Sequence, residues 1–330
     1  MNRFATMLLR LCIFLFLAPL PNSAVTIRTV LVGNPGNAAD PADGDLQTPG
    51  VQNFGNVDYT YRIGTYEVTN AEYAEFLNAK DPAGANQLGL WKSQMMTHPQ
   101  IGGIGFSGSN PPGSKYILIE GKQNHPVPLI AWYDAIRFAN WLNNGQGNGD
   151  TESGAYTLLG ATPTPSNASS ITRNPGATIF LPSENEWYKA AYYDPIASSY
   201  FHYATSSNSP PIASGPSVLA NHANYLASVS NLLTDVGAYA GTTSPYGAFD
   251  MNGSLWEWNE VMIGSRRGLR GGGFGSQALD LSRLYRYDLA RPNDGNGEFG
   301  FRVATVPEPS TIALAAFGAL GLLIAARRKR

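Results

Sequence analysis

The chain has 330 residues, a formal net charge of −2, 14% charged residues and 43% hydrophobic residues. A chain of this size can bury a large core, and its nearly neutral charge without a basic stripe excludes a general nucleic-acid binder. Glycine (36 residues) and proline (23 residues) are abundant without a fixed period, which predicts a loop-rich globular fold rather than a fibre or a solenoid.

The first 24 residues have the pattern of a secretory signal peptide. Arg3 and Arg10 lie before an apolar run over residues 11–20, and a short polar segment then ends in the small residue Ala24. We therefore expect export and removal of residues 1–24. An N-terminal membrane anchor is the weaker alternative, because the apolar run is too short to span a bilayer. The only cysteine, Cys12, lies inside this segment, so the mature chain has no thiol.

Residues 306–330 form a tail with three parts. The motif Pro307-Glu308-Pro309 is followed by an apolar run over residues 311–326 and by a basic cluster over residues 327–330. As a helix the run would be ~24 Å long, shorter than a ~30 Å hydrocarbon core, so we expect at least transient membrane insertion with the basic end in the cytoplasm. The tail resembles the PEP-CTERM sorting signal. That resemblance implies an exosortase-type processing enzyme and delivery to the cell envelope, the cell surface or the extracellular polysaccharide matrix; a plain anchor is the alternative.

The body of the chain, residues 25–305, is expected to be one domain of mixed strands and helices. Strands are predicted at residues 25–32, 57–68, 116–120 and 299–304. Helices are predicted after the capping box of Thr69 and Glu72, over residues 132–142, and after the capping box of Ser183 and Glu186. Long polar stretches rich in glycine and proline separate these elements.

Residues 247–260 combine more chemically distinctive side chains than any other stretch. Asp250 precedes the turn Asn252-Gly253, and an extended segment after the turn would place Trp256 and Trp258 on one face and Glu257 on the other. Buried acids are paired or bound to a metal. Calcium and arginine partners are both open, and spacing alone favours arginine. The candidate counter-charges are Arg270, Arg286 and Arg302.

The sequence carries no signature of a common catalytic centre. The four histidines, His98, His125, His202 and His222, are scattered without a zinc or iron spacing, and no GxSxG motif is present. A zinc, iron or serine-hydrolase site is therefore not supported by spacing.

Six motifs in order carry a family resemblance over residues 57–305. They are Tyr66-Glu67-Val68-Thr69-Asn70, Ala131-Trp132-Tyr133-Asp134, Leu181-Pro182-Ser183-Glu184-Asn185-Glu186-Trp187, Asp250-Met251-Asn252-Gly253-Ser254-Leu255-Trp256-Glu257-Trp258, Arg270-Gly271-Gly272-Gly273-Phe274 and Gly300-Phe301-Arg302. Together they resemble the formylglycine-generating enzyme (sulfatase-modifying factor) family. The resemblance implies an α+β, C-type lectin-like fold, loop-rich with low regular secondary structure and stabilised by calcium.

The resemblance also implies particular ligands and thereby favours calcium over arginine pairing at residues 247–260. One calcium would be held by the side chains of Asp250 and Glu257 and by the carbonyl groups of Gly253 and Leu255. A second calcium site is implied near Asn224 and Tyr225.

The catalytic residues of the family are replaced in this chain. Its enzymes bind copper through two cysteines, and the matching positions here are Ser276 and Leu281. Neither side chain supplies a thiolate, so we expect no copper and no formylglycine-generating oxidase activity.

Three functional hypotheses follow, and the first is preferred. An exported, non-catalytic protein would use the family's substrate groove to bind a polysaccharide or a peptide. Alternatively, an enzyme of the same superfamily would run altered chemistry, such as that of a non-haem iron site, or the domain would be a matrix building block without a pocket. The residues proposed for the groove, each also typical of a core, are Trp256, Trp258, Arg270, Ser276, Tyr285 and Arg286.

Overall fold

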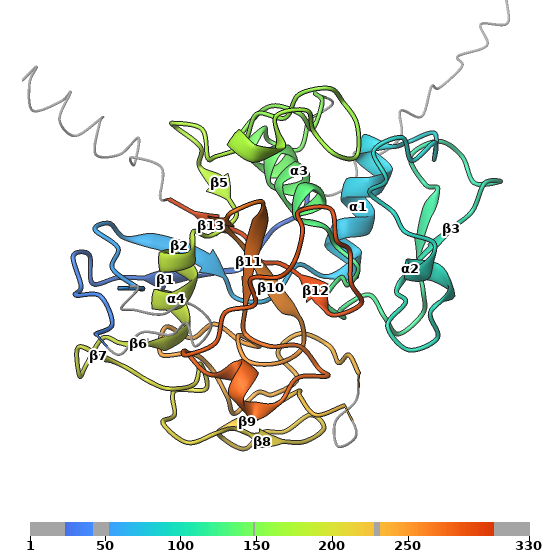
Figure 1. Ribbon diagram of the computed structural model, residues 1–330. Helices are drawn as coiled ribbons and strands as arrows, with labels where there is room; N and C mark the ends of the chain where they lie inside the picture. Colours follow the sequence, from blue (N-terminus) through green and yellow to red (C-terminus); the bar gives the residue numbers. More distant parts are fainter. Residues whose placement is uncertain (1–23, 42–52, 148, 228–231, 307–330) are drawn as a thin grey trace, which may run out of the picture.

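A computed structural model describes residues 24–41, 53–147, 149–227 and 232–306. It has an α+β architecture built from short elements joined by long irregular segments, as the sequence predicts (Figure 1). The predicted signal peptide, apart from Ala24, and the predicted tail after Val306 lie outside the described residues. Within the described ranges, no helix is long and apolar enough to cross a membrane.

One sheet joins the two ends of the domain. Its four strands lie in the order β1-β2-β13-β5, and every neighbouring pair is antiparallel. The strand nearest the C-terminus is therefore held between an early strand and a central one. The bounds are β1 Thr29–Val32, β2 Tyr61–Gly64, β5 Ile179–Phe180 and β13 Ala304–Thr305.

A second sheet carries the acidic stretch predicted from the sequence. Strand β10 (Trp256–Ile263) pairs with β11 (Arg266–Arg270) in antiparallel fashion and with β12 (Phe299–Gly300) in parallel. Three small pairs complete the strands. They are β3 Ile104–Phe106 with β4 Tyr116–Leu118, β6 Tyr193–Asp194 with β7 Ser199–Tyr200, and β8 Ile212–Ala213 with β9 His222–Ala223.

The three longest helices of the described residues begin where the sequence predicts, whereas a short helix at residues 94–97 was not predicted. Helix α1 (Asn70–Lys80) follows Thr69, whose hydroxyl accepts a hydrogen bond from the Glu72 amide while the Glu72 carboxylate accepts one from the Thr69 amide. The capping box of Ser183 and Glu186 likewise opens α4. The other helical segments are α2 Gln94–Thr97, α3 Trp132–Asn143, α4 Glu184–Tyr192 and the 3₁₀ turns Ala168–Ser170 and Ala278–Leu281.

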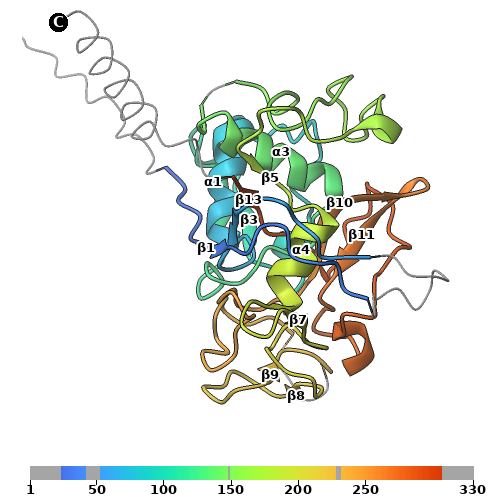
Figure 2. The ribbon, with the colours of Figure 1, turned by 90° about the vertical axis from the view of Figure 1, so that its left-hand side faces the viewer.

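Aromatic side chains join the helices to the sheets in one core. Phe138 of α3 contacts Phe76 of α1 at 5.4 Å and Phe301 at 5.3 Å between ring centroids. Helices α1 and α3 lie together at one end of the molecule, and the segment with β8 and β9 lies at the opposite end (Figures 1 and 2). The sheet with β10 and β11 lies between these two ends.

All four predicted strands are divided or shortened in the structure. The strand expected over residues 116–120 ends at Leu118. The prediction of one strand over residues 299–304 is wrong, because the chain leaves the β10 sheet after Gly300 and joins the β1 sheet at Ala304. Arg302 lies in the crossing between the two sheets and is 0% exposed. The expected strands over residues 25–32 and 57–68 are confined to Thr29–Val32 and Tyr61–Gly64.

Candidate functional site

The turn before β10 is held by backbone contacts with two distant segments. The Gly253 amide donates to the Gly271 carbonyl at 2.9 Å, and the Ser254 amide donates to the Asn224 carbonyl at 2.8 Å. Gly253 has φ +82°, and a Cβ atom there would lie 2.2 Å from the Asn224 carbonyl oxygen. Only glycine fits both the backbone conformation and this close approach. The turn thus brings Asn224, a predicted ligand, next to residues 247–260.

Glu257 is a fully buried acid with strong partners. Its carboxylate accepts from the Arg302 guanidinium at 2.6 and 2.7 Å and from the Trp187 indole at 2.8 Å, and Glu257 is 0% exposed. The predicted orientation is confirmed: Glu257 lies against α4, whereas Trp258 stacks edge-on against Phe299 on the other face. The arginine pairing predicted from spacing is therefore present at Glu257.

A second buried acid, Glu67, lies beside Glu257 and was not predicted as a site residue. Its Oε1 accepts from the Leu255 amide at 3.1 Å, and the residue is 2% exposed. Its Oε2 has no hydrogen-bond partner within the part of the chain that the structure describes. Burial, then the charges of Glu257 and Asp250, raise the pKa of Glu67 well above its ordinary value. Glu67 is thus an acid that resists ionisation at this position.

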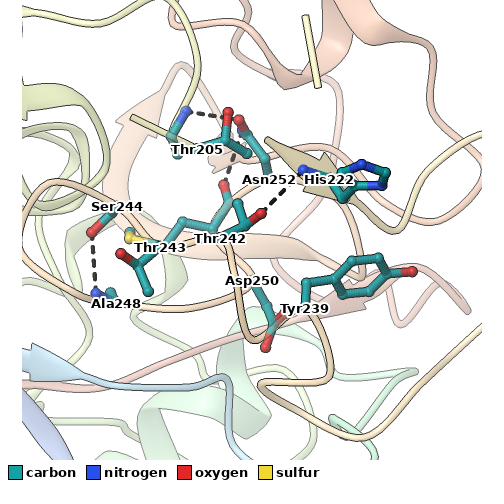
Figure 3. A pocket seen from close by; sticks show the side chains of 12 residues that line it. Thr205, His222, Tyr239, Thr242, Thr243, Ser244, Ala248, Asp250 and Asn252 are labelled. Carbon is teal, nitrogen blue, oxygen red and sulfur yellow. Dashed lines mark hydrogen bonds between the residues drawn. The ribbon is translucent and has the colours of Figure 1, made fainter. Parts of the chain in front are cut away.

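Asp250 completes the acidic group. Its Oδ2 accepts from the Gly237 amide at 2.6 Å, and burial raises the pKa of Asp250 to about 6 despite that hydrogen bond and the Arg302 charge. Figure 3 shows Asp250 beside Tyr239 in a small polar cavity, with Asn252 and Thr242 also on its wall. The cavity has a volume of about 10 Å³, room for roughly one water molecule or ion. We call Glu67, Asp250, Glu257 and Arg302 the acid-rich centre.

The donor chemistry of this region suits calcium, which prefers oxygen ligands. Two buried oxygens, Glu67 Oε2 and Asn224 Oδ1, have no hydrogen-bond partner among the described residues. Glu257, by contrast, already shares its carboxylate with Arg302 and Trp187. Among the described residues, no three acidic, histidine or cysteine side chains converge as a metal cluster. A calcium ion there would therefore need backbone carbonyl groups, such as those of Gly253 and Leu255, as further ligands.

A separate buried acid has two arginines of its own. Glu184, at the start of α4, accepts from Arg270 at 2.8 Å and from Arg286 at 3.0 Å. Arg270 also lies over the rings of Phe54 and Tyr188, at 4.6 and 5.0 Å from the centroids. All three predicted counter-charges, Arg270, Arg286 and Arg302, thus bind buried acids. We call Glu184, Arg270 and Arg286 the arginine-balanced centre.

The expected groove is not open in the structure. Trp258 and Arg270 are 0% exposed, so the prediction that these two side chains line an accessible groove is wrong. Trp258 donates from its indole to the Ile130 carbonyl at 2.8 Å, which is a core contact. Trp256, Ser276 and Arg286 are also buried. Trp256 packs on the partly exposed Tyr285, with 5.7 Å between the ring centroids.

The two residues that the family resemblance matches to copper-binding cysteines, Ser276 and Leu281, both lie beside one glycine. A Cβ atom at Gly272 would lie 2.5 Å from Leu281 Cδ1 and 3.5 Å from Ser276 Cβ. Ser276 accepts from the Gly273 amide at 2.9 Å, and Leu281 is 0% exposed. This site therefore presents one satisfied hydroxyl and a hydrocarbon side chain. Neither group is a ligand for copper.

The histidines do not form a shared site among the described residues. His125 Nε2 lies 3.6 Å from Asp235, and burial lowers the pKa of His125 below its ordinary value. His222 contacts the Ser214 hydroxyl at 2.9 Å through Nδ1.

Comparison with known proteins identifies the class of domain. Residues 24–306 match the model of the sulfatase-modifying factor enzyme 1-like domain, so the chain belongs to this family. Its fold is accordingly that of the formylglycine-generating enzymes, of the C-type lectin-like type. Residues 305–330 match the PEP-CTERM protein-sorting motif, which indicates export, association with the envelope and processing by an exosortase-type enzyme.

Two relatives of known activity align with only part of this chain. Hercynine oxygenases from Mycolicibacterium smegmatis and Mycobacterium tuberculosis are 29% and 25% identical over 203 residues. The alignments cover 60% of this chain but only 36% and 37% of those proteins, so the chain spans little more than a third of their length.

Solved structures with similar topology are more distant in sequence. Treponema denticola variable protein 1 is 18% identical, with 86% of this chain and 97% of that chain covered and a TM-score of 0.49. CarF is 21% identical, with 86% and 99% covered and a TM-score of 0.49. PvdO from Pseudomonas aeruginosa is 16% identical, with 84% and 94% covered and a TM-score of 0.44.

Proposed function

We propose that this chain is an exported, non-catalytic protein of the cell envelope or the extracellular polysaccharide matrix, where it binds a ligand or serves as a structural component. The observation that carries the proposal is the pair Ser276 and Leu281 beside Gly272, because these residues occupy the positions that the family resemblance matches to the copper-binding cysteines and neither supplies a thiolate. The sorting motif supports the location.

We further propose that calcium stabilises the domain. The side chains of Asp250 and Glu257 and the carbonyl groups of Gly253 and Leu255 would hold one ion, and a second would lie near Asn224 and Tyr225. Two observations support this. The acid-rich centre holds three carboxyl groups against one arginine, and Asn224 Oδ1 is buried without a partner among the described residues.

A ligand such as a polysaccharide or a peptide would bind away from the buried remains of the catalytic site. A cavity of about 620 Å³ on the surface is large enough for a small ligand. Its wall includes Gln100, Lys122, His125, Thr234 and Asp235, which offer charged and hydrogen-bonding groups. We propose this cavity as the first place to look for ligand contacts, by chemical-shift or crosslinking measurements in a screen of glycans and peptides.

The test of the non-catalytic proposal is an oxidation assay. The purified protein is loaded with copper and incubated with a cysteine-containing peptide, and formylglycine is measured by mass spectrometry. A copper-binding enzyme of the same family serves as the positive control. We expect no product above the metal-free background. Copper-dependent turnover by this chain would overturn the proposal.

An enzyme with altered chemistry is the second candidate, because the two hercynine oxygenases share 29% and 25% identity with this chain in the region aligned. This candidate requires a redox metal in the purified protein. Its test is the iron content of the protein, together with oxygen consumption after iron loading. Stoichiometric iron that supports oxygen consumption would favour this candidate over the first.

A further inference from the structure

Val25, near the start of the described chain, is bound by one side chain far along the sequence. The Val25 amide donates to Gln146 Oε1 at 2.7 Å, and Gln146 Nε2 donates to the Val25 carbonyl at 2.7 Å. The two residues are 121 positions apart. A side-chain amide thus binds both backbone groups of one residue, as a neighbouring strand would.

The local fold holds Gln146 in place for this contact. It follows α3, its amide donates to the Trp141 carbonyl at 2.9 Å, and its φ is +61°. A non-glycine residue in this conformation costs of order 1 kcal/mol and persists only where surrounding contacts enforce it. The conformation directs the amide side chain towards Val25.

A cavity of about 170 Å³ surrounds this contact. Ala24 and Val25 line it together with Glu75 and Ala79 of α1 and with Trp141, Gly145 and Gln146. Among the described residues that line it, Glu75 carries the one charged side chain. An amide oxygen and a carboxylate beside a backbone nitrogen are the groups that bind an ammonium ion.

We propose that this cavity binds the N-terminus of the mature protein. That N-terminus is produced when a leader peptidase hydrolyses the bond between Ala24 and Val25. Water supplies OH to the Ala24 carbonyl carbon and H to the Val25 nitrogen, so the products at neutral pH are a carboxylate and the Val25 α-ammonium. The ammonium keeps its hydrogen bond to Gln146 Oε1, and Glu75 balances its charge. The inference rests on the export part of the proposed function.

Processing would therefore strengthen a contact that the precursor makes only as a neutral amide. The amide of the precursor has one N–H group and no charge, whereas an ammonium has three donors and attracts Glu75. Removal of the leader would then fix the N-terminal segment that precedes β1 against α1 and the end of α3.

The first test is the mass of the mature chain. The full-length protein is produced in an exporting bacterium, and the N-terminal peptide of the envelope fraction is identified by mass spectrometry. We expect Val25 as the first residue. A mature chain that is exported but begins at another residue would overturn the inference and leave the proposed function intact. A chain that is not exported would contradict the proposed function itself.

The second test is the reactivity of the α-amine. In the processed protein, acylation of the Val25 amine at neutral pH is followed by peptide mass spectrometry for the wild type, Gln146→Ala, Glu75→Gln and the surface control Gln123→Ala. A bound ammonium has a raised pKa and reacts more slowly, so we expect an increase of about three- to tenfold in Gln146→Ala and Glu75→Gln. Gln123→Ala should match the wild type. Equal rates in all four proteins would overturn the inference, and Glu75→Gln alone decides it if Gln146→Ala does not fold.

Discussion

The two buried centres of this domain differ in how the charge of their carboxyl groups is balanced. In the arginine-balanced centre, Glu184 has two guanidinium partners, Arg270 and Arg286. In the acid-rich centre, Arg302 binds Glu257 while Glu67 and Asp250 add further carboxyl groups. The first centre is complete with protein groups alone. The second has excess negative charge when ionised, so its stability depends on bound protons or on a cation.

The largest expected effect is at Arg302, the arginine of the acid-rich centre that pairs with Glu257. Arg302→Met leaves Glu257 buried without its charge partner, which should lower the free energy of unfolding by about 3–5 kcal/mol. Urea denaturation measures the change. The matched control is Arg286→Met, which leaves Arg270 on Glu184 and should cost about 1.5–3 kcal/mol. Equal costs at the two centres would contradict the difference between them.

The next largest effect tests whether calcium stabilises the domain. Calcium removal by a chelator should lower the melting temperature, because an ion that binds only the folded state contributes about 2.7 kcal/mol at a hundredfold excess over its dissociation constant. Asp250→Ala should cost a similar amount, and the two losses should not add. Thermal unfolding of both proteins with and without the chelator gives all four values. Additive losses would show that Asp250 serves a purpose other than calcium binding.

The smallest effect is the change in stability with pH that the acid-rich centre produces when calcium is absent. The raised pKa values of Glu67 and Asp250 mean that the folded state keeps protons which the unfolded state releases at lower pH. The free energy of unfolding should therefore fall as the pH rises above about 4. The part that Asp250 contributes should be lost as the pH passes its folded-state pKa of about 6. Stability in chelator is measured from pH 4 to 8.

The variant Glu67→Gln distinguishes the contribution of Glu67 to this pH dependence of stability from that of Asp250. The glutamine keeps an oxygen for the Leu255 amide but removes the charge, so we expect it to be more stable than the wild type by about 1 kcal/mol at pH 8 and equal to it near pH 4. Glu72→Gln, in the partly buried capping box nearby, gives a comparison in which a charge is removed but an oxygen for the Thr69 amide is kept. A Glu67→Gln variant that is less stable at pH 8 in chelator would contradict a protonated Glu67.

Local signals in the sequence predicted the parts of the fold that depend on neighbouring residues. Thr69 and Glu72 are three positions apart, so their capping box can be read directly from the chain, and the alternation around Glu257 correctly separates the tryptophans from the acid. The family motifs directed attention to Ser276 and Leu281, which both lie beside Gly272 in the structure.

Contacts between distant segments account for what the sequence did not predict. Glu67 reaches the Leu255 amide across 188 positions, and no local pattern indicates that pairing. The groove prediction failed at Trp258 because alternation shows which face a side chain occupies but not whether another segment covers that face. Here Ile130 and Phe299 cover it. A local pattern also gives no sign that residues 299–304 cross from one sheet to another.

The metal content of the mature protein tests the central claim most directly. The protein is isolated from the envelope fraction without added metal, and its calcium, copper and iron are measured by elemental analysis together with protein concentration. A calcium-stabilised domain without catalytic chemistry should contain calcium and no stoichiometric copper or iron. Stoichiometric copper or iron would contradict that account and would indicate an enzyme.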